Sequence, residues 1–172
     1  MLIFLIGFMG VGKTTTGRKL ANRLQLPFLD MDDAFAHYFG KSVTDTIEQE
    51  GEQSFRQQEH ELLKELIATN TDALISTGGG APCYYDNMKV MNEAGITLYL
   101  SAPVGALVVR LSQSCTSRPL VKDKKGEELR TSISQLLNKR RPYYEQARIT
   151  ADALSVSAEQ LERILRNYTL PL

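Results

Sequence analysis

The segment that most constrains the fold of this chain is the glycine-rich stretch after its first apolar run. Residues 7–14 read Gly-Phe-Met-Gly-Val-Gly-Lys-Thr, which matches the G-x-x-x-x-G-K-[ST] pattern of a phosphate-binding loop. The wholly apolar residues 2–6 predict a buried parallel strand before the loop, and residues 14–24 predict a helix after it. This strand–loop–helix order favours a true phosphate loop over a chance match.

Each part of this loop suits a nucleoside triphosphate. Gly7, Gly10 and Gly12 allow tight backbone turns, so that successive N–H groups and the positive helix end can face an anion. We expect Lys13 to reach the β- and γ-phosphates and the Thr14 hydroxyl to ligate Mg²⁺. The loop therefore predicts nucleotide binding.

Length and charge narrow the class of protein. The 172 residues fit one domain, and 20 basic side chains balance 20 acidic ones, so the net charge favours neither nucleic-acid nor membrane binding. Cys83 and Cys115 have no metal-ligand spacing and are expected to be free thiols in a reducing cytosol. The apolar N-terminus lacks the basic region of a signal peptide, and no apolar run reaches transmembrane length. We expect a cytoplasmic protein.

Strand-like and helix-like segments alternate along the rest of the chain. This alternation predicts an α/β fold, a parallel sheet with helices on both faces. The further strands are predicted at residues 26–29, 73–76, 96–100 and, more weakly, 149–154. The further helices are predicted at residues 52–68, 82–93, 104–111, 127–140 and 158–168.

One polar, basic stretch, residues 112–126, lacks this periodicity. A loop of this length in a compact domain is usually functional or disordered. Beside a phosphate loop it is best interpreted as a lid whose arginine completes a phosphoryl-transfer site. The alternative is a solvated surface loop.

The second predicted strand ends in Asp30-Met31-Asp32. Two carboxylates at positions i and i+2 of a strand share one face, and ligands of open α/β sheets bind at the carboxyl ends of strands. One carboxylate could orient a Mg²⁺-bound water, and the other could hold a substrate hydroxyl in line with the γ-phosphate. Alternatively, Asp32 or Asp33 caps a helix that begins near Ala34; of the two, Asp33 is assigned the cap.

Arginines and glycines complete the predicted site. Arg56, near the start of the long helix, is either a surface residue or a bidentate clamp for a carboxylate. The three glycines at 78–80 follow the third strand and are best explained by close approach of the backbone to a ligand. Adjacent Arg140 and Arg141 cannot both face one pocket, and Pro142 predicts a helix boundary. A small anionic polyhydroxy molecule would fit such a site.

Taken together, these motifs resemble the shikimate kinase family, in order and in spacing. The resemblance covers most of the chain. It is carried by residues 7–14, Asp30-Met31-Asp32, Gly51-Glu52 with Phe55-Arg56 and Glu59, residues 78–81, Arg118-Pro119-Leu120, and residues 140–144.

The resemblance implies a P-loop kinase that transfers the ATP γ-phosphate to the 3-hydroxyl of shikimate, a step toward chorismate and the aromatic amino acids. It implies one domain over residues 1–172, with a lid at about 112–126 and a shikimate-binding helical region at about 31–60. It also implies a three-layer α/β/α fold whose five-stranded parallel sheet has the order 2-3-1-4-5. We expect a monomer whose partners are shikimate, ATP and Mg²⁺.

The resemblance also assigns roles. Lys13, Asp32 and Arg118 are implied to be catalytic, with Asp32 as candidate base and Arg118 on the lid. Thr14, and Asp30 through water, would hold the metal. The implied substrate-binding residues are Asp32, Arg56, Gly79 and Arg140, with the two arginines on the carboxylate. The implied ATP-binding residues are Gly10, Val11, Gly12, Lys13, Thr14, Thr15 and Arg118.

Some assignments stay open. Arg110 and the loop near Ser157 are the candidates for adenine contact. No Walker-B aspartate ends the third strand, where Ser76-Thr77 stands, so Asp30 would take its metal role. The competing functions are a gluconate kinase, a nucleoside-monophosphate kinase, and an ATP-binding regulatory module. The Phe55-Arg56 and Arg118-Pro119-Leu120 contexts favour shikimate.

Overall fold

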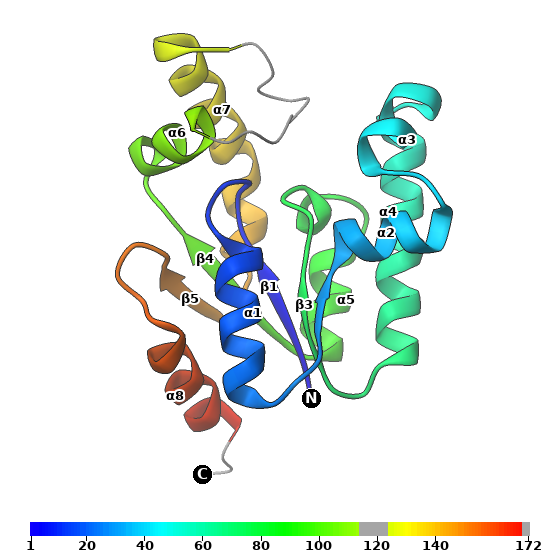
Figure 1. Cartoon of the computed structure of the whole chain (residues 1–172), viewed down its shortest axis with the longest axis vertical. Helices are drawn as coiled ribbons and strands as arrows, with labels where there is room; N and C mark the ends of the chain where they lie inside the picture. Colours follow the sequence, from blue (N-terminus) through cyan, green and yellow to red (C-terminus); the bar gives the residue numbers. More distant parts are fainter. Residues whose placement is uncertain (114–123, 170–172) are drawn as a thin grey trace.

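The computed structural model describes residues 1–113 and 124–169. In these residues five parallel strands form one sheet in the order β2-β3-β1-β4-β5, as the family resemblance implied (Figure 1). The strands are β1 (Leu2–Ile6), β2 (Phe28–Asp30), β3 (Ala73–Ser76), β4 (Ile96–Ser101) and β5 (Ile149–Asp152).

The sheet is buried because helices cover both of its faces. Side chains alternate along a strand, so Leu5 of β1 faces α1 while Tyr99 of β4, on the other face, stacks on Tyr144 of α7. The central strand β1 is buried at all five positions, which explains why its sequence is a continuous apolar run instead of an alternating one. The prediction of a three-layer α/β/α fold is confirmed.

The described helices agree with most of the predicted segments. They are α1 (Lys13–Leu24), α2 (Met31–Phe39), α3 (Val43–Glu50), α4 (Glu52–Thr69), η1 (Ala81–Cys83, a 3-10 turn), α5 (Asn87–Ala94), α6 (Val104–Ser112), α7 (Gly126–Tyr144) and α8 (Ala158–Thr169). Helices α1 and α8 pack together on one face of the sheet, while α5 and α7 lie on the other (Figure 1).

Three local predictions were wrong. The segment 82–93 is not one helix, because the η1 turn precedes α5 there. Helix α3, whose N-cap Ser42 accepts a hydrogen bond from the Asp45 N–H, was not predicted at all. Helix α7 does not end before Pro142 as predicted but continues to Tyr144. The burial of Tyr144 favours this last turn, and a proline so near the helix end removes only one backbone hydrogen bond.

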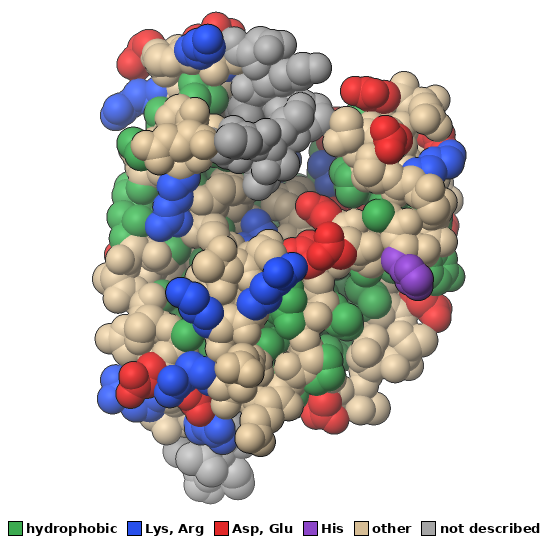
Figure 2. Space-filling model, in the orientation of Figure 1, with side chains coloured by type: hydrophobic (Ala, Val, Ile, Leu, Met, Phe, Trp, Pro, Cys, Tyr) green, Lys and Arg blue, Asp and Glu red, His purple; other side chains and the backbone are tan. Residues whose placement is uncertain are grey.

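The helices α2, α3 and α4 stand beside the sheet and form their own small apolar cluster. Its buried members are Phe35, Phe55 and Leu62. This cluster holds the helical region next to the carboxyl ends of the strands, and the space-filling view shows the molecular surface hollowed there, with acidic and basic side chains around the hollow (Figure 2).

Candidate functional site

The phosphate loop joins β1 to α1 at the carboxyl edge of the sheet. Gly12, the N-cap of α1, has φ 102°, a left-handed conformation that side chains disfavour. The Lys13 ammonium donates hydrogen bonds to the carbonyls of Gly7 and Phe8, at 2.8 and 3.1 Å. The lysine therefore already lies across the loop that the sequence predicts to hold phosphates.

The two predicted metal residues are in contact. The Thr14 hydroxyl donates to an Asp30 carboxylate oxygen at 2.8 Å, and both residues line a cavity of about 230 Å³ together with the phosphate loop. Hard oxygen donors of this kind suit Mg²⁺, which keeps several waters and takes few protein ligands. The residues present therefore fit the metal.

The assignment of the helix cap was wrong. Asp30, not Asp33, is the N-cap of α2, and its carboxylate accepts the Asp32 N–H at 3.1 Å. Asp33 is exposed and lies 3.9 Å from Arg18 in a surface ion pair. Asp30 ends the strand, whereas Asp32 lies in the first turn of α2, so the two carboxylates do not share a strand face. Both nevertheless line the 230 Å³ cavity.

A second cavity, of about 440 Å³, adjoins the first. Asp32, Gly78 and Gly79 line both cavities, so they form the boundary between the phosphate loop and the second space. The second cavity also brings together Arg56 from α4 and Arg140 from α7, which are far apart in the sequence. All four predicted substrate-binding residues thus line a single cavity.

Arg56 is buried, with 7% of its surface exposed, and its guanidinium is held on several sides. It pairs with Glu59 at 2.7 Å and with Glu52 at 3.2 Å, and it lies over the Tyr84 ring at 4.3 Å. These ion pairs and the bond from Nε to Glu52 use one N–H on each nitrogen. A guanidinium has five N–H donors, which is more than these contacts with the two carboxylates use.

Arg140 is equally buried, at 6% exposure, and lies over the Phe8 ring at 5.7 Å. Its neighbour Arg141 is exposed, as expected for adjacent positions on a helix. Arg140 carries a second buried positive charge in the lining of the cavity, in addition to that of Arg56.

The sequence motif contained Glu59 but assigned it no role. Its carboxylate is 3% exposed, and burial raises its pKa, while the neighbouring Arg56 lowers it. Burial lowers the pKa of Arg56, but the charge and hydrogen bond of Glu59, together with Tyr84 and Glu52, outweigh burial, so the pKa of Arg56 is raised. Arg56 and Glu59 therefore form one buried unit, which the i, i+3 spacing on α4 could have indicated.

The three glycines form a wall between these charges. A Cβ atom on Gly80 would lie 2.5 Å from the Arg56 guanidinium, and one on Gly78 would lie 2.6 Å from a Glu59 oxygen. No larger residue fits at either place without moving a buried charge. These glycines are therefore needed for the close approach to Arg56 and Glu59, while the approach to a ligand expected from the sequence stays a prediction.

Three further residues were predicted to contact ATP. Arg118 lies outside the described residues, as do most of residues 112–126. Arg110 donates a hydrogen bond to the Val11 carbonyl at 2.6 Å, which places its guanidinium on the phosphate loop. Ser157 caps the start of α8 by accepting the Gln160 N–H at 3.1 Å.

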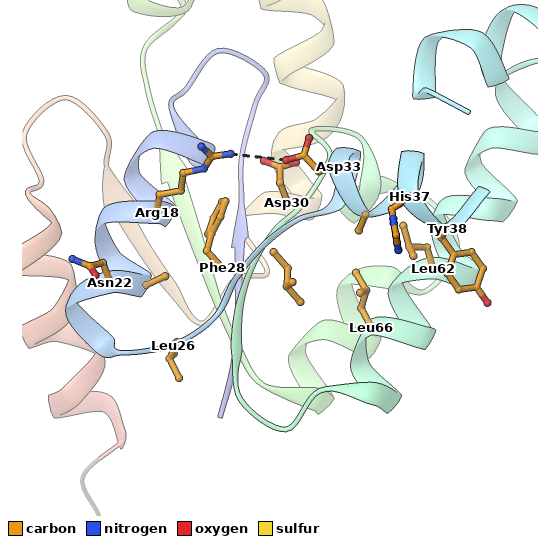
Figure 3. A pocket seen from close by; sticks show the side chains of 13 residues that line it. Arg18, Asn22, Leu26, Phe28, Asp30, Asp33, His37, Tyr38, Leu62 and Leu66 are labelled. Atoms are coloured by element: carbon orange, nitrogen blue, oxygen red, sulfur yellow. Dashed lines mark ion pairs between the residues drawn. The ribbon is translucent and has the colours of Figure 1, made fainter. Parts of the chain in front are cut away.

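A larger cavity, of about 780 Å³, lies elsewhere, along the outer edge of β2 between α1, α2 and α4 (Figure 3). Its labelled side chains mix apolar and aromatic groups with polar and charged ones, and the Arg18–Asp33 ion pair stands at its rim (Figure 3). It contains no residue of the phosphate loop, so the two smaller cavities are the better candidate site.

Within the described residues, no helix has both the length and the apolar character needed to cross a membrane.

Residues 9–169 match the family model described as shikimate kinase. A shikimate kinase of Parabacteroides distasonis is 45% identical over 157 residues, which cover 91% of this chain and 90% of that protein.

Solved structures of the same description are similar over nearly the whole chain. The crystal structure of shikimate kinase from Bacteroides thetaiotaomicron has a TM-score of 0.91 and 38% identity, and the match covers 96% of this chain and 98% of that one. Shikimate kinase from Acinetobacter baumannii in complex with shikimate has a TM-score of 0.86 and 32% identity, with 99% and 95% covered.

Proposed function

The chain belongs to the shikimate kinase family, and from this premise we propose how its residues transfer the γ-phosphate of ATP to the 3-hydroxyl of shikimate. The proposal rests on one observation: the two cavities meet at three shared residues, Asp32, Gly78 and Gly79. A phosphate donor on the loop and an anionic acceptor beside the arginines would meet at Asp32.

The buried guanidinium groups bind the acceptor. Arg56 and Arg140 pair with the shikimate carboxylate, and their burial strengthens this attraction because water does not screen it. The ring then lies along Gly79, with its hydroxyls toward Asp32. Binding in this geometry removes most of the orientational freedom of the attacking oxygen.

Asp32 acts on the attacking hydroxyl. The 3-hydroxyl oxygen attacks the γ-phosphorus, the bond from that phosphorus to the β–γ bridging oxygen breaks, and the hydroxyl proton passes to Asp32. Lys13, which lies across the loop, stabilises the charge on the transferring group. The products are 3-phosphoshikimate and ADP.

Thr14 and Asp30 would hold Mg²⁺, Thr14 directly and Asp30 through water. When bound, the ion neutralises charge on the phosphate oxygens. The contact between the two side chains keeps both oxygens at the phosphate cavity. Arg118 is proposed to stabilise the transferring phosphate from the lid at about 112–126, on the strength of its sequence context alone.

We also propose that the enzyme works as a monomer in the cytoplasm, with residues 1–172 as a single kinase domain. Both cavities are lined by residues of one chain, which supports a site that needs no second copy. Sedimentation of the purified chain at micromolar concentration would yield a mass of about 19 kDa; twice that value would contradict the monomer.

A coupled assay of ADP release tests the function. Shikimate, gluconate and nucleoside monophosphates are offered in parallel with Mg·ATP, and only shikimate is expected to give rapid turnover. Lys13→Ala should abolish that turnover while the far-ultraviolet spectrum stays that of the wild type. Faster turnover with gluconate would refute the assignment of the acceptor.

The role of Asp32 has its own test. Asp32→Asn keeps the size of the side chain but removes the proton acceptor, so kcat should fall by roughly 10²–10⁴-fold. Asp33→Asn, one residue along and exposed, is the matched control and should leave kcat near its original value. Equal kcat values for the two variants would remove Asp32 from the mechanism.

A further inference from the structure

The carbonyls of the glycine wall, Gly78 to Gly80, and of Ala81 after it all accept a hydrogen bond from inside the protein. The Gly78 carbonyl accepts the Ala81 N–H at 3.2 Å, and the Gly80 carbonyl accepts the Cys83 N–H at 2.8 Å. These two bonds are internal to the turn that leads into η1. The other two carbonyls are held by side chains.

Tyr144 holds the carbonyl of Gly79. Its hydroxyl donates to that oxygen at 2.5 Å from the last residue of α7. The side chain is fully buried against Tyr99, with ring centroids 5.1 Å apart. Burial raises the pKa of Tyr144, against the opposing effect of Arg140, so the phenol keeps its proton and acts as a donor.

Asn87 holds the carbonyl of Ala81. Its amide nitrogen donates to that oxygen at 2.8 Å, and the side chain is completely buried at the start of α5. The amide oxygen then faces His60 Nδ1 at 2.6 Å. Because an amide oxygen can only accept, His60 must carry a proton on Nδ1. His60 in turn stacks on the Tyr85 ring at 4.9 Å.

These side chains also tie the wall to the two arginines. Tyr144 lies four residues after Arg140 on α7, and His60 lies four residues after Arg56 on α4. Residues with this spacing share one side of a helix. The helices that carry the guanidinium groups therefore also hold the glycine wall at a fixed place relative to them.

We propose that Tyr144 and Asn87 are positioning residues that keep the carbonyls of the wall turned inward, so that the wall offers the substrate donors and not acceptors. A planar trans peptide places its C=O and N–H on opposite sides. With the Gly79 carbonyl held by Tyr144, the Gly80 N–H points the other way. A wall of this kind attracts the oxygens of a carboxylated polyol.

The physical reason for needing such residues is the freedom of glycine. The peptide between Gly79 and Gly80 is flanked by two residues without Cβ, so it can rotate more readily than other peptides. Rotation would bring a carbonyl oxygen against the substrate oxygens and repel them. The inference rests on the proposed function, because it concerns the affinity of the site for shikimate.

Calorimetric titration of shikimate into five variants, together with steady-state kinetics for ATP, tests the proposal. Tyr144→Phe and Asn87→Leu remove the two inward donors while keeping the branching of each side chain, and each should raise the shikimate Kd roughly fivefold or more, while the KM for ATP changes by less than about twofold. Thr97→Val is the matched control: its hydroxyl is also buried and makes two hydrogen bonds, to Asn92 and Arg148, away from the wall. It should leave both constants unchanged.

Substitution of His60 gives an independent test, because this side chain is only half-buried. His60→Leu removes the donor to Asn87 and should raise the shikimate Kd, whereas His60→Asn carries an amide nitrogen in the place of Nδ1 and should restore it. The inference would be overturned, and the proposed function left standing, if the shikimate Kd were the same as in Thr97→Val for all three of the variants Tyr144→Phe, Asn87→Leu and His60→Leu. Failure of the wild type to release ADP with shikimate would overturn the proposed function as well.

Discussion

At the scale of residues, the site is defined by charges that the protein buries. Arg56, Glu59 and Arg140 are each less than a tenth exposed, and charged side chains are rarely buried unless they are paired. Two positive charges and one negative charge are therefore buried at the cavity, and the exposed Asp32 and Glu52 add further carboxylates to its lining. A ligand carboxylate would be bound by the guanidinium groups themselves and not by a net positive charge of the cavity.

The sequence predicted the types of these residues better than their surroundings. Arg140 was identified by its motif, and its separation from Arg141 followed from helical geometry. The cap of α2 was assigned wrongly because Asp30, Asp32 and Asp33 are all good caps, and only the end of the strand decides among them. Sequence pattern alone does not show where a strand of three residues ends.

Substituting the buried arginine should affect one substrate only. Arg140→Ala removes a buried partner of the shikimate carboxylate, so the shikimate KM should rise by roughly 30-fold or more, with little change in the KM for ATP. Steady-state kinetics with each substrate varied in turn measures both constants. Arg141→Ala is the matched control, because that side chain is exposed on the same helix. Equal increases in both KM values would argue against a carboxylate clamp.

The thiol of Cys83 should be unreactive at neutral pH. Burial raises its pKa to about 11, although Arg140 and Arg56 act in the opposite direction. In a Cys115→Ser variant, alkylation by iodoacetamide should therefore increase about tenfold per pH unit from pH 8 toward 11, because only the thiolate reacts. Mass spectrometry measures the rate. A plateau near pH 9, as expected for the protein unfolded in urea, would contradict the shift.

The same shift has a consequence for stability. The folded protein holds the thiol proton more tightly than the unfolded chain does. The protonated thiol of Cys83 therefore makes its full contribution to the free energy of unfolding below about pH 9. It is lost as the pH rises toward 11. Urea unfolding of the Cys115→Ser variant and of a Cys83→Ala, Cys115→Ser double variant should show the difference in free energy of unfolding narrowing over that range.

At the scale of elements, the predicted helices were correct where the apolar period was long and wrong where tertiary contacts decide. Helix α4 was predicted within one residue at its end, since its apolar spacing continues over 18 residues. Helix α7 was ended too early, because the prediction weighed Pro142 and not the burial of Tyr144. Helix α3 is short, and besides its Ser42 cap it depends on packing against the cluster of Phe35, Phe55 and Leu62.

The glycine wall gives the prediction that belongs to this scale. In Gly80→Ala the added methyl would lie 2.5 Å from the Arg56 guanidinium, which its pairs with Glu59 and Glu52 hold in place. Gly80 has φ −96°, so the conflict is steric and not a matter of backbone strain. Displacement of the arginine or of the wall should raise the shikimate KM roughly 10- to 100-fold.

Gly105→Ala provides the control for that substitution. An added Cβ there meets no atom within 4 Å, in helix α6. It should leave the shikimate KM unchanged and raise the free energy of unfolding by about 0.5–1 kcal/mol. An unchanged shikimate KM and a raised free energy of unfolding in Gly80→Ala as well would contradict the predicted clash between the added methyl group and Arg56.

At the scale of the whole molecule, the sequence alone predicted a parallel sheet but not the order of its strands. Alternating segments specify the sheet and its covering helices, whereas the neighbours of a strand depend on how crossovers pack. The order β2-β3-β1-β4-β5 came from the family resemblance. It places the ends of β1, β2 and β3 side by side, and this is what brings the phosphate loop, Asp30 and the glycine wall into one site.

Because both cavities belong to the native fold, ligands should stabilise the whole molecule. Shikimate at 100 times its Kd should add about 2.7 kcal/mol to the free energy of unfolding and raise the Tm by roughly 5–10 °C, as should Mg·ATP separately. Scanning calorimetry measures both shifts, with gluconate as the control ligand. In Arg140→Ala the shift with shikimate at the same concentration should shrink while that with Mg·ATP persists, since only one cavity has lost a charge. Loss of both shifts would mean that Arg140 supports the fold of the site and not the binding of a carboxylate.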